Sequence, residues 1–311
     1  MELNELLLLD SVVLVEESYA AQKWLERTRT YLGKIKHKDL ESAIRIRDTA
    51  GVLIGLALRD RELGFWMIFT DVLADPGLRA EFEALAAGIP GAGERDAVVD
   101  RAAFHEAVIE YYSLGLVNRF FCACELKAPS FYPRDRVESL KVVLTEFFEV
   151  MGIDAPERTR SLEIGCGDGG ATLALHEVGL SPLTIDIEKC EICKGLEEGV
   201  LDPKKSIVLD CSHLSAFFGR EFELVFGFMV GKLNPFDNFM WERVLREVPK
   251  VVKTKGKVLF TVSSKEEAEL LVELLHPFFD ASVRENKTSN GYFDQWLYMA
   301  AVKSEFTELR V

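Results

Sequence analysis

A glycine-rich turn at residues 165–170 is the first place where this sequence could hold a ligand. The turn follows a short apolar segment, Leu162-Glu163-Ile164, and precedes an apolar segment from Ala171 that is predicted to be helical. Glycines lack the Cβ atoms that keep a backbone away from a ligand, and the start of a helix offers free N–H groups and the positive end of its dipole. The pattern predicts a binding site for a nucleotide-like ligand.

Two acidic residues follow later predicted strands and extend this candidate site. Asp186 ends the segment 183–186, 21 positions after Gly165, and its carboxylate is well placed to accept hydrogen bonds from two ribose hydroxyls. Asp210 ends the segment 206–210 and suits the amino group of an adenine ring. A turn without a ligand would leave both acids unexplained, so we interpret them as parts of one site.

The spacing of the glycines fits two ligand classes. Gly165, Gly167 and Gly170 match the G-x-G-x-x-G pattern of dinucleotide sites. The same turn, with Glu163 before it and Gly169 as its third glycine, also matches the acidic-x-G-x-G-x-G pattern of S-adenosylmethionine sites. The spacing alone therefore leaves NAD and S-adenosylmethionine open.

The order of the predicted elements favours S-adenosylmethionine. Apolar segments at residues 223–228 and 257–262 are separated by predicted helices, as a doubly wound parallel sheet requires. Residues 281–285 and 292–302 are joined by a short polar turn, and strands joined in this way must pair antiparallel. We therefore expect a seven-stranded α/β sheet with a terminal antiparallel hairpin, where a NAD-binding fold would more often carry another parallel unit.

The stretch from about residue 161 to 304 resembles the class I S-adenosylmethionine-dependent methyltransferases, with Glu163 in the first strand and Asp186 and Asp210 after the second and third. The resemblance implies that Asp186 holds the ribose, and that Asp210 with the backbone of Cys211 holds the adenine. It also implies that Glu163 supports the loop or the amino group of the cofactor, S-adenosyl-L-methionine, and that the glycines pack against its methionine part. The residues expected to bind the cofactor are Glu163, Gly165, Cys166, Gly167, Asp186, Ile187, Asp210, Cys211 and Phe228.

The first part of the chain shows a different pattern. Helical periodicity dominates from Leu3 to Met151, and no run alternates convincingly between apolar and polar residues. The last predicted helix lies between Pro133 and Gly152. We therefore expect an all-helical N-terminal domain over residues 1–153, which caps the acceptor site or forms a homo-oligomer. The cofactor-binding domain is expected over residues 154–311.

Composition limits the partners of the protein. The chain has 311 residues with 48% hydrophobic content, which is typical of a globular protein with a substantial core. Its formal net charge of −14 argues against a nucleic-acid surface, which would need many Lys and Arg residues to neutralise phosphates. No apolar run approaches the roughly 18 residues of a membrane span, and the acidic start is unlike a signal peptide. We expect a cytoplasmic protein without a membrane segment.

Two close pairs of cysteines are candidates for a metal site. Cys122 with Cys124 and Cys190 with Cys193 provide the right number of thiolates for tetrahedral zinc. The first pair lies in an apolar segment, where free cysteine behaves as a small hydrophobic residue. The second pair lies at a predicted helix start close to Asp186. We therefore expect reduced thiols and no metal.

No catalytic residue is identified, because methyl transfer from a sulfonium requires above all an acceptor held in line with the methyl group. Residues 234–236, Asn-Pro-Phe, are similar to the Asn-Pro-Pro-Tyr signature of amino-methyltransferases, but they lack the second proline and begin too far beyond their strand. Methylation of bases or glutamine is therefore not carried over. We expect a small-molecule acceptor, with a protein side chain as the alternative. A regulatory protein that binds the cofactor without turnover is the second hypothesis, and a NAD-binding oxidoreductase is the third.

Overall fold

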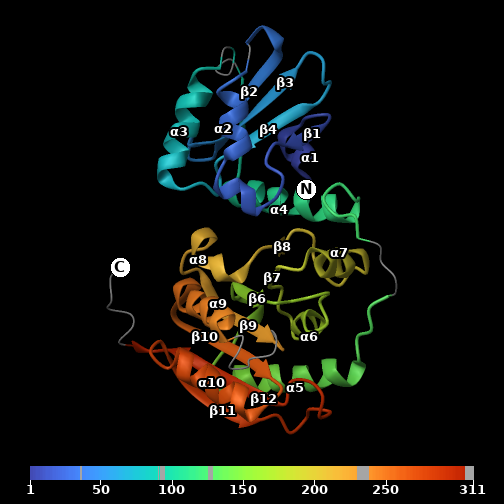
Figure 1. The fold of residues 1–311 in the computed structure, drawn as a ribbon, viewed down its shortest axis with the longest axis vertical. Helices are drawn as coiled ribbons and strands as arrows, with labels where there is room; N and C mark the ends of the chain where they lie inside the picture. Colours follow the sequence, from blue (N-terminus) through green and yellow to red (C-terminus); the bar gives the residue numbers. More distant parts are fainter. Residues whose placement is uncertain (36, 90, 92–94, 125–128, 230–237, 305–311) are drawn as a thin grey trace. The chain divides into compact units, whose positions relative to one another are not determined.

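The computed structural model describes the chain except for residues 36, 90, 92–94, 125–128, 230–237 and 305–311. The chain divides into two compact units, Met1–Ala123 and Cys124–Val311 (Figure 1). Among the described residues, no helix is both long and apolar enough to span a bilayer.

The first unit is built around a five-stranded mixed sheet with the strand order β1-β4-β3-β2-β5. Strands β2, β3 and β4 pair antiparallel, while β1 and β5 pair parallel with β4 and β2. The strands are β1 (Val12–Leu14), β2 (Leu40–Asp48), β3 (Leu53–Asp60), β4 (Trp66–Thr70) and β5 (Asp96–Val99). The helices are α1 (Leu3–Leu7), α2 (Glu26–Leu32), α3 (Pro76–Ala87) and α4 (Arg101–Val117), with short 3₁₀ turns η1 (Ala20–Lys23) and η2 (His37–Asp39).

The expectation of an all-helical N-terminal domain is therefore wrong. All five residues of β4 are buried, and so are the five middle residues of β3. A strand that is covered on both faces has a continuous apolar sequence, which periodicity alone does not distinguish from a buried helix. The signal that was missed is the turn between β2 and β3, where the Asp48 carboxylate accepts hydrogen bonds from the N–H groups of Ala50 and Val52 and Gly51 has a φ of 81°.

The second unit confirms the predicted sheet. Its seven strands have the order β11-β12-β10-β9-β6-β7-β8. The five strands from β10 to β8 pair parallel, while β12 pairs antiparallel with both β10 and β11. The strands are β6 (Ser161–Ile164), β7 (Leu183–Asp186), β8 (Ser206–Val208), β9 (Phe222–Phe228), β10 (Val252–Val262), β11 (Phe279–Glu285) and β12 (Trp296–Val302). The helices are α5 (Arg134–Met151), α6 (Thr172–Glu177), α7 (Lys189–Glu197), α8 (Leu214–Phe217), α9 (Asn238–Val251) and α10 (Lys265–Leu275), with 3₁₀ turns η3 (Pro156–Arg158) and η4 (Cys211–His213).

Helix α5 belongs to the second unit. Its buried residues, among them Leu140, Leu144 and Phe147, share one hydrophobic core with residues of the seven-stranded sheet such as Phe226. The rings of Phe147 and Phe226 lie 6.0 Å apart at 71°, an edge-to-face arrangement. The chain therefore divides between Ala123 and Cys124, and the helix before β6 forms part of the second unit.

The parallel strands bring the predicted chemistry to one edge of the sheet. The carboxyl ends of β6, β7 and β8 are adjacent, and each is followed directly by candidate residues. The N–H of Gly165 donates to the carbonyl of Ile185 at 2.8 Å, and the N–H of Leu209 donates to the carbonyl of Asp186 at 3.0 Å. These hydrogen bonds fix the glycine turn and both acids relative to one another.

Candidate functional site

A cavity of about 440 Å³ lies at the carboxyl ends of β6, β7 and β8. Five of the nine residues that were predicted to bind the cofactor line this cavity, so residues from separate sequence motifs lie close together in the structure. The predicted residues that line the cavity are Gly165, Asp186, Ile187, Asp210 and Cys211. The other lining residues are Ile164, Ser212, Met240, Trp241, Arg243 and Val244.

The wall formed by α9 was not predicted. Met240, Trp241, Arg243 and Val244 come from the first half of this helix, and Met240 is exposed. The indole of Trp241 adds a large, flat apolar surface to this wall. No motif in the sequence marks these residues, because only the packing of α9 against η4 brings them to the cavity.

The glycine turn has a backbone that other residues would strain. Gly165, Gly167 and Gly169 all have positive φ, at 66°, 56° and 94°. A Cβ atom on Gly169 would lie 2.6 Å from Cγ1 of Val200, so this glycine is required for packing as well as for conformation. A Cβ atom on Gly167 would meet no atom within 4 Å. The turn is therefore packed against the protein at Gly169 and open at Gly167.

Asp186 ties the glycine turn to the end of β7. Its Oδ2 accepts a hydrogen bond from the N–H of Gly167 at 2.8 Å, and its Oδ1 accepts one from the N–H of Glu188 at 2.8 Å. A carboxylate has about four acceptor positions, so two remain for a ligand. Ile187 follows with 59% of its surface exposed and contributes an apolar part of the cavity wall.

Asp210 occupies the matching position after β8. Its Oδ1 accepts from the N–H of Ser212 at 2.8 Å, and its Oδ2 lies 3.6 Å from Nδ1 of His213. These contacts hold the carboxylate at the start of η4 beside the cavity. The adjacent Cys211 thiol has its pKa raised to about 12 by burial, then by Asp186, so it stays protonated. Cys211 therefore supplies backbone and a small side chain rather than a thiolate.

Glu163 lies below the turn and is only 1% exposed. Its Oε2 accepts a hydrogen bond from Oγ1 of Thr172 at 2.7 Å, which joins β6 to the start of α6. Burial raises the pKa of the Glu163 carboxyl to about 8, although the Thr172 hydrogen bond and the charge of Arg136 act in the opposite direction. A neutral carboxylic acid at this position supports the loop, which is one of the two roles that the resemblance implied.

Cys166 and Phe228, also predicted as cofactor residues, are buried and do not line the cavity. Burial raises the pKa of the Cys166 thiol well above its usual range, which makes it a neutral small side chain. Phe228 ends β9 with its ring stacked on Phe226 at 6.0 Å. Residues 230–237, which include the Asn234-Pro235-Phe236 segment, lie outside the described residues.

The segment before α5 supplies contacts to the turn that the sequence did not reveal. Oγ of Ser130 donates to Oδ2 of Asp168 at 2.5 Å, and the hydroxyl of Tyr132 donates to the carbonyl of Asp168 at 2.9 Å. The N–H of Ser130 also donates to Oε1 of Glu198 at 2.6 Å. Residues remote in sequence thus hold the outer side of the glycine turn.

The cysteines differ in state. Cys122 and Cys124 are disulfide-bonded, so the expectation of six reduced thiols is wrong for this pair. Within the described residues, Cys166, Cys190, Cys193 and Cys211 are thiols that form no disulfide bond. The absence of a metal at either pair stays a prediction.

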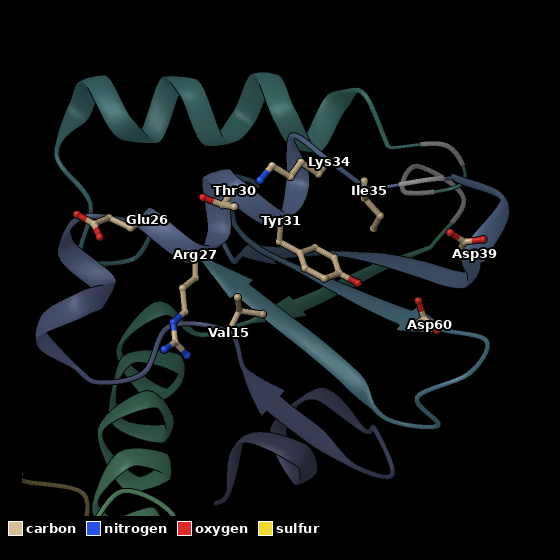
Figure 2. Close-up of a pocket in the computed structure, with 9 residues that line it drawn as sticks. All are labelled: Val15, Glu26, Arg27, Thr30, Tyr31, Lys34, Ile35, Asp39 and Asp60. Atoms are coloured by element: carbon tan, nitrogen blue, oxygen red, sulfur yellow. The ribbon is translucent and has the colours of Figure 1, made fainter.

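The first unit has a cavity of its own, of about 800 Å³, between α2 and the ends of β2 and β3 (Figure 2). Its lining carries both signs of charge, with Arg27 and Lys34 on α2 or just after it and Asp39 and Asp60 on the opposite side. The ring of Tyr31 points toward these two acids (Figure 2), and burial, Asp60 and Asp39 together raise the pKa of its hydroxyl. The mixed charge favours no single ligand class.

No family model matches the chain, and no curated protein is similar to it in sequence. Solved structures of S-adenosylmethionine-dependent methyltransferases are consistently similar to part of it, at low sequence identity. One from Clostridium acetobutylicum has 12% identity and a TM-score of 0.44, covering 54% of this chain and 92% of its own. Magnesium protoporphyrin IX methyltransferase from Synechocystis, solved with bound S-adenosylmethionine, has 11% identity and a TM-score of 0.40, covering 63% of this chain and 96% of its own. The PH0226 protein from Pyrococcus horikoshii has 20% identity and a TM-score of 0.43, covering 56% of this chain and 92% of its own.

Proposed function

We propose that the second unit binds S-adenosyl-L-methionine and that the protein transfers its methyl group to a small molecule. The observation that carries this proposal is the cavity that joins Gly165, Asp186 and Asp210 at the carboxyl ends of three adjacent strands. Ligands of open α/β sheets bind at this edge. The antiparallel β12 beside β10 supports S-adenosylmethionine over NAD, for the reason given from the sequence.

The described residues fit this cofactor. The cavity offers two carboxylates for hydroxyl and amino donors, and Trp241 and Ile187 provide apolar surface for an adenine ring. The open side of Gly167 leaves room for a ligand to approach the backbone closely. In the proposed complex Asp186 accepts hydrogen bonds from the ribose, and Asp210 accepts one from the adenine.

The cofactor supplies an electrophilic methyl group, and the protein supplies position. Proximity and alignment of an acceptor with that group account for much of the acceleration in such a reaction. The thiols of Cys166 and Cys211 do not act as methyl acceptors, because burial raises the pKa of both and keeps them protonated. No general base is assigned.

Titration calorimetry with S-adenosylhomocysteine and with NADH tests the cofactor. We expect heat of binding with the first ligand alone, and binding of NADH instead would overturn the proposal. A methyl-transfer assay with labelled S-adenosylmethionine and a panel of small-molecule acceptors tests the reaction. Binding without transfer to small molecules or to protein side chains would favour the second hypothesis, a regulatory protein that uses the cofactor as a signal.

We infer that the first unit selects the acceptor or forms a homo-oligomer, because the predicted cofactor residues all lie in the second unit. Removal of residues 1–123 tests this role. The remaining chain should keep its affinity for S-adenosylhomocysteine and lose methyl transfer to its acceptor. Full activity of the shortened protein as a monomer, when the intact chain is a dimer, would assign the first unit to oligomerisation.

A further inference from the structure

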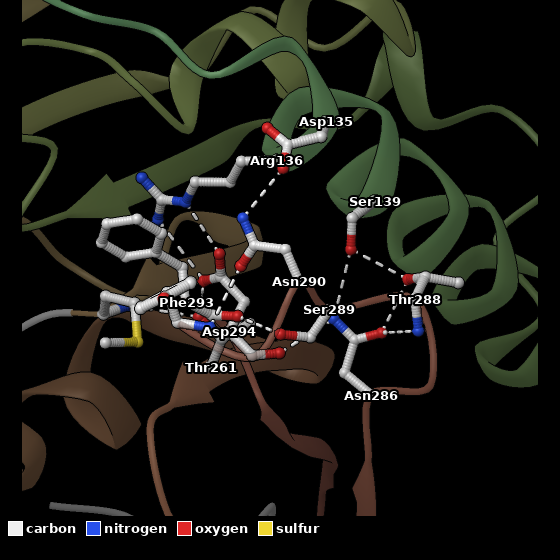
Figure 3. Close-up of polar contacts among 12 residues, drawn as sticks. Asp135, Arg136, Ser139, Thr261, Asn286, Thr288, Ser289, Asn290, Phe293 and Asp294 are labelled. Carbon is white, nitrogen blue, oxygen red and sulfur yellow. Dashed lines mark hydrogen bonds and ion pairs between the residues drawn. The ribbon is translucent and has the colours of Figure 1, made fainter.

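Arg136 and Asp294 form a largely buried ion pair (Figure 3). Arg136 is in the first turn of α5, and Asp294 is in the connection between β11 and β12. Nε of Arg136 donates to Oδ2 of Asp294 at 2.8 Å, and Nη2 is 3.4 Å from Oδ1. The two side chains are 16% and 2% exposed. This forked geometry fixes the plane of the guanidinium group.

Further contacts hold both partners in place. The ring of Phe293 lies under the guanidinium, with its centroid 5.0 Å from Cζ of Arg136 (Figure 3). Oδ1 of Asp294 accepts a hydrogen bond from Oγ1 of Thr261 at 2.5 Å, and Oγ1 of Thr261 accepts one from the N–H of Met229 at 3.1 Å. The ion pair is thereby connected to the carboxyl ends of β9 and β10.

The connection that carries Asp294 is also attached to α5 by further hydrogen bonds (Figure 3). Oγ of Ser139 and Oγ1 of Thr288 share a hydrogen bond at 2.9 Å, and Nδ2 of Asn290 donates to Oδ2 of Asp135 at 2.9 Å. The carbonyl of Asp294 itself accepts from Nδ2 of Asn286 at 2.8 Å. The position of the Asp294 carboxylate is therefore set before any ligand arrives.

The third nitrogen of the guanidinium has no such partner. Within the described part of the chain Nη1 of Arg136 makes no hydrogen bond, and it lies 3.5 Å from the point that a Cβ atom on Gly170 would occupy. Two N–H groups of a largely buried cation thus lie against the glycine turn. Nη1 is not itself a fully buried atom, so a ligand carboxylate can reach it and accept a charge-assisted hydrogen bond from it.

The sheet order indicates which part of the ligand reaches this place. The adenine and ribose positions lie at Asp210 after β8 and Asp186 after β7, and the turn after β6 follows. The next strands in the same direction are β9 and β10, where Thr261 connects to the ion pair. A ligand that extends from β8 across β6 brings its far end toward Arg136.

We propose that Arg136 binds the carboxylate of the cofactor's methionine moiety, and that Asp294 is a positioning residue that orients the guanidinium for it. The inference rests on the proposed function, since it assumes that the adenosine part occupies the cavity at Asp186 and Asp210. Arg136 supplies the charge and two donors through Nη1. Asp294 touches no ligand and acts through Arg136.

Two ligands that differ in the amino-acid part test this assignment by calorimetry on the full chain. S-adenosylhomocysteine carries the carboxylate, and 5′-methylthioadenosine lacks the whole amino-acid part. Arg136→Gln should lower the affinity for S-adenosylhomocysteine by about tenfold or more, and it should change the affinity for 5′-methylthioadenosine by no more than about twofold. Asp294→Asn should lower the affinity for S-adenosylhomocysteine by a smaller factor, again without changing the affinity for 5′-methylthioadenosine. The matched control is Arg134→Gln, on the same helix, whose exposed side chain pairs with Glu177 and should affect neither ligand.

A comparison of two ligands on the wild-type protein avoids the risk that a variant misfolds. Wild-type protein should bind the decarboxylated analogue of S-adenosylhomocysteine about tenfold more weakly than S-adenosylhomocysteine itself. If Arg136→Gln lowered the affinity for S-adenosylhomocysteine and for 5′-methylthioadenosine equally, the ion pair would have only a structural role and the assignment would be overturned. Equal wild-type affinity for the decarboxylated analogue would also overturn it. Failure of wild-type protein to bind any of these ligands would instead refute the proposed cofactor.

Discussion

Replacement of Glu163 by glutamine tests whether the carboxyl group beneath the glycine turn is neutral. The side chain is almost fully buried, and burial raises the pKa of its carboxyl from 4.5 to about 8 in the folded protein. Between these values the folded protein holds a proton that the unfolded chain releases. The stabilising contribution is thus complete below pH 4.5, decreases as the pH rises, and is lost above about pH 8. Glutamine has nearly the same shape and can still accept the hydrogen bond from Thr172.

The size of the effect follows from proton linkage. Each pH unit in this interval lowers the free energy of unfolding of the wild type by about 1.4 kcal/mol relative to a variant that cannot ionise. Because the slope is shallower close to each pKa, Glu163→Gln should gain about 3.5 kcal/mol relative to wild type between pH 5 and pH 8. The pKa of about 8 already includes the opposing charge of Arg136, and the slope reflects the one proton that the folded protein retains.

Urea unfolding at several pH values measures this difference. The two units can unfold separately, so the signal must come from the second unit alone. Trp24 and Trp66 are in the first unit, and replacing both by phenylalanine leaves the fluorescence of Trp241 and Trp296 as the report. Glu285→Gln, which removes an exposed carboxylate from β11, is the control and should show no comparable slope. If the difference in free energy of unfolding between Glu163→Gln and wild type stayed constant from pH 5 to pH 8, Glu163 would be ionised in the folded protein and the reasoning would be refuted.

Three further results are expected. Asp186→Ala should weaken S-adenosylhomocysteine by about 1.5 to 3 kcal/mol for each charge-assisted hydrogen bond lost, and unchanged affinity by calorimetry would remove Asp186 from the site. Gly169→Ala should destabilise the second unit by about 1 to 3 kcal/mol in urea, because of its positive φ and the 2.6 Å approach to Val200, whereas Gly219→Ala, which would meet no atom within 4 Å, should change little. Binding of S-adenosylhomocysteine should change the tryptophan fluorescence, and Trp241→Phe should abolish that change; its persistence would place the adenine elsewhere.

The sequence was sufficient to predict those parts of the site that lie within short, continuous segments of the chain. The glycine turn and the acids at Asp186 and Asp210 each follow a short apolar strand, and parallel pairing of those strands necessarily brings them to one edge. The terminal hairpin was also predictable, because its short connection permits only antiparallel pairing.

The parts that were missed depend on distant contacts or on ambiguous patterns. Trp241 reaches the cavity through the packing of α9, and Arg136 meets Asp294 across 158 positions of sequence. No spacing rule connects such residues. In the first unit, β3 and β4 have continuous apolar sequences because they are covered on both faces. Such a run has no periodicity that distinguishes a buried strand from a buried helix, so the prediction of helices there had no firm basis.

The separation of Arg136 and Asp294 has a consequence for how the protein is made. During synthesis, the chain from α5 to β10 can leave the ribosome and begin to pair while Asp294 is still untranslated. The hairpin of β11 and β12 must then pair with β10 before the carboxylate can meet the guanidinium, and closing so long a loop has an entropic cost. The cation beside the glycine turn would thus gain its counterion only after the hairpin has been made, so premature termination near the hairpin would yield a chain that retains Asp186 and Asp210 but leaves that cation uncompensated.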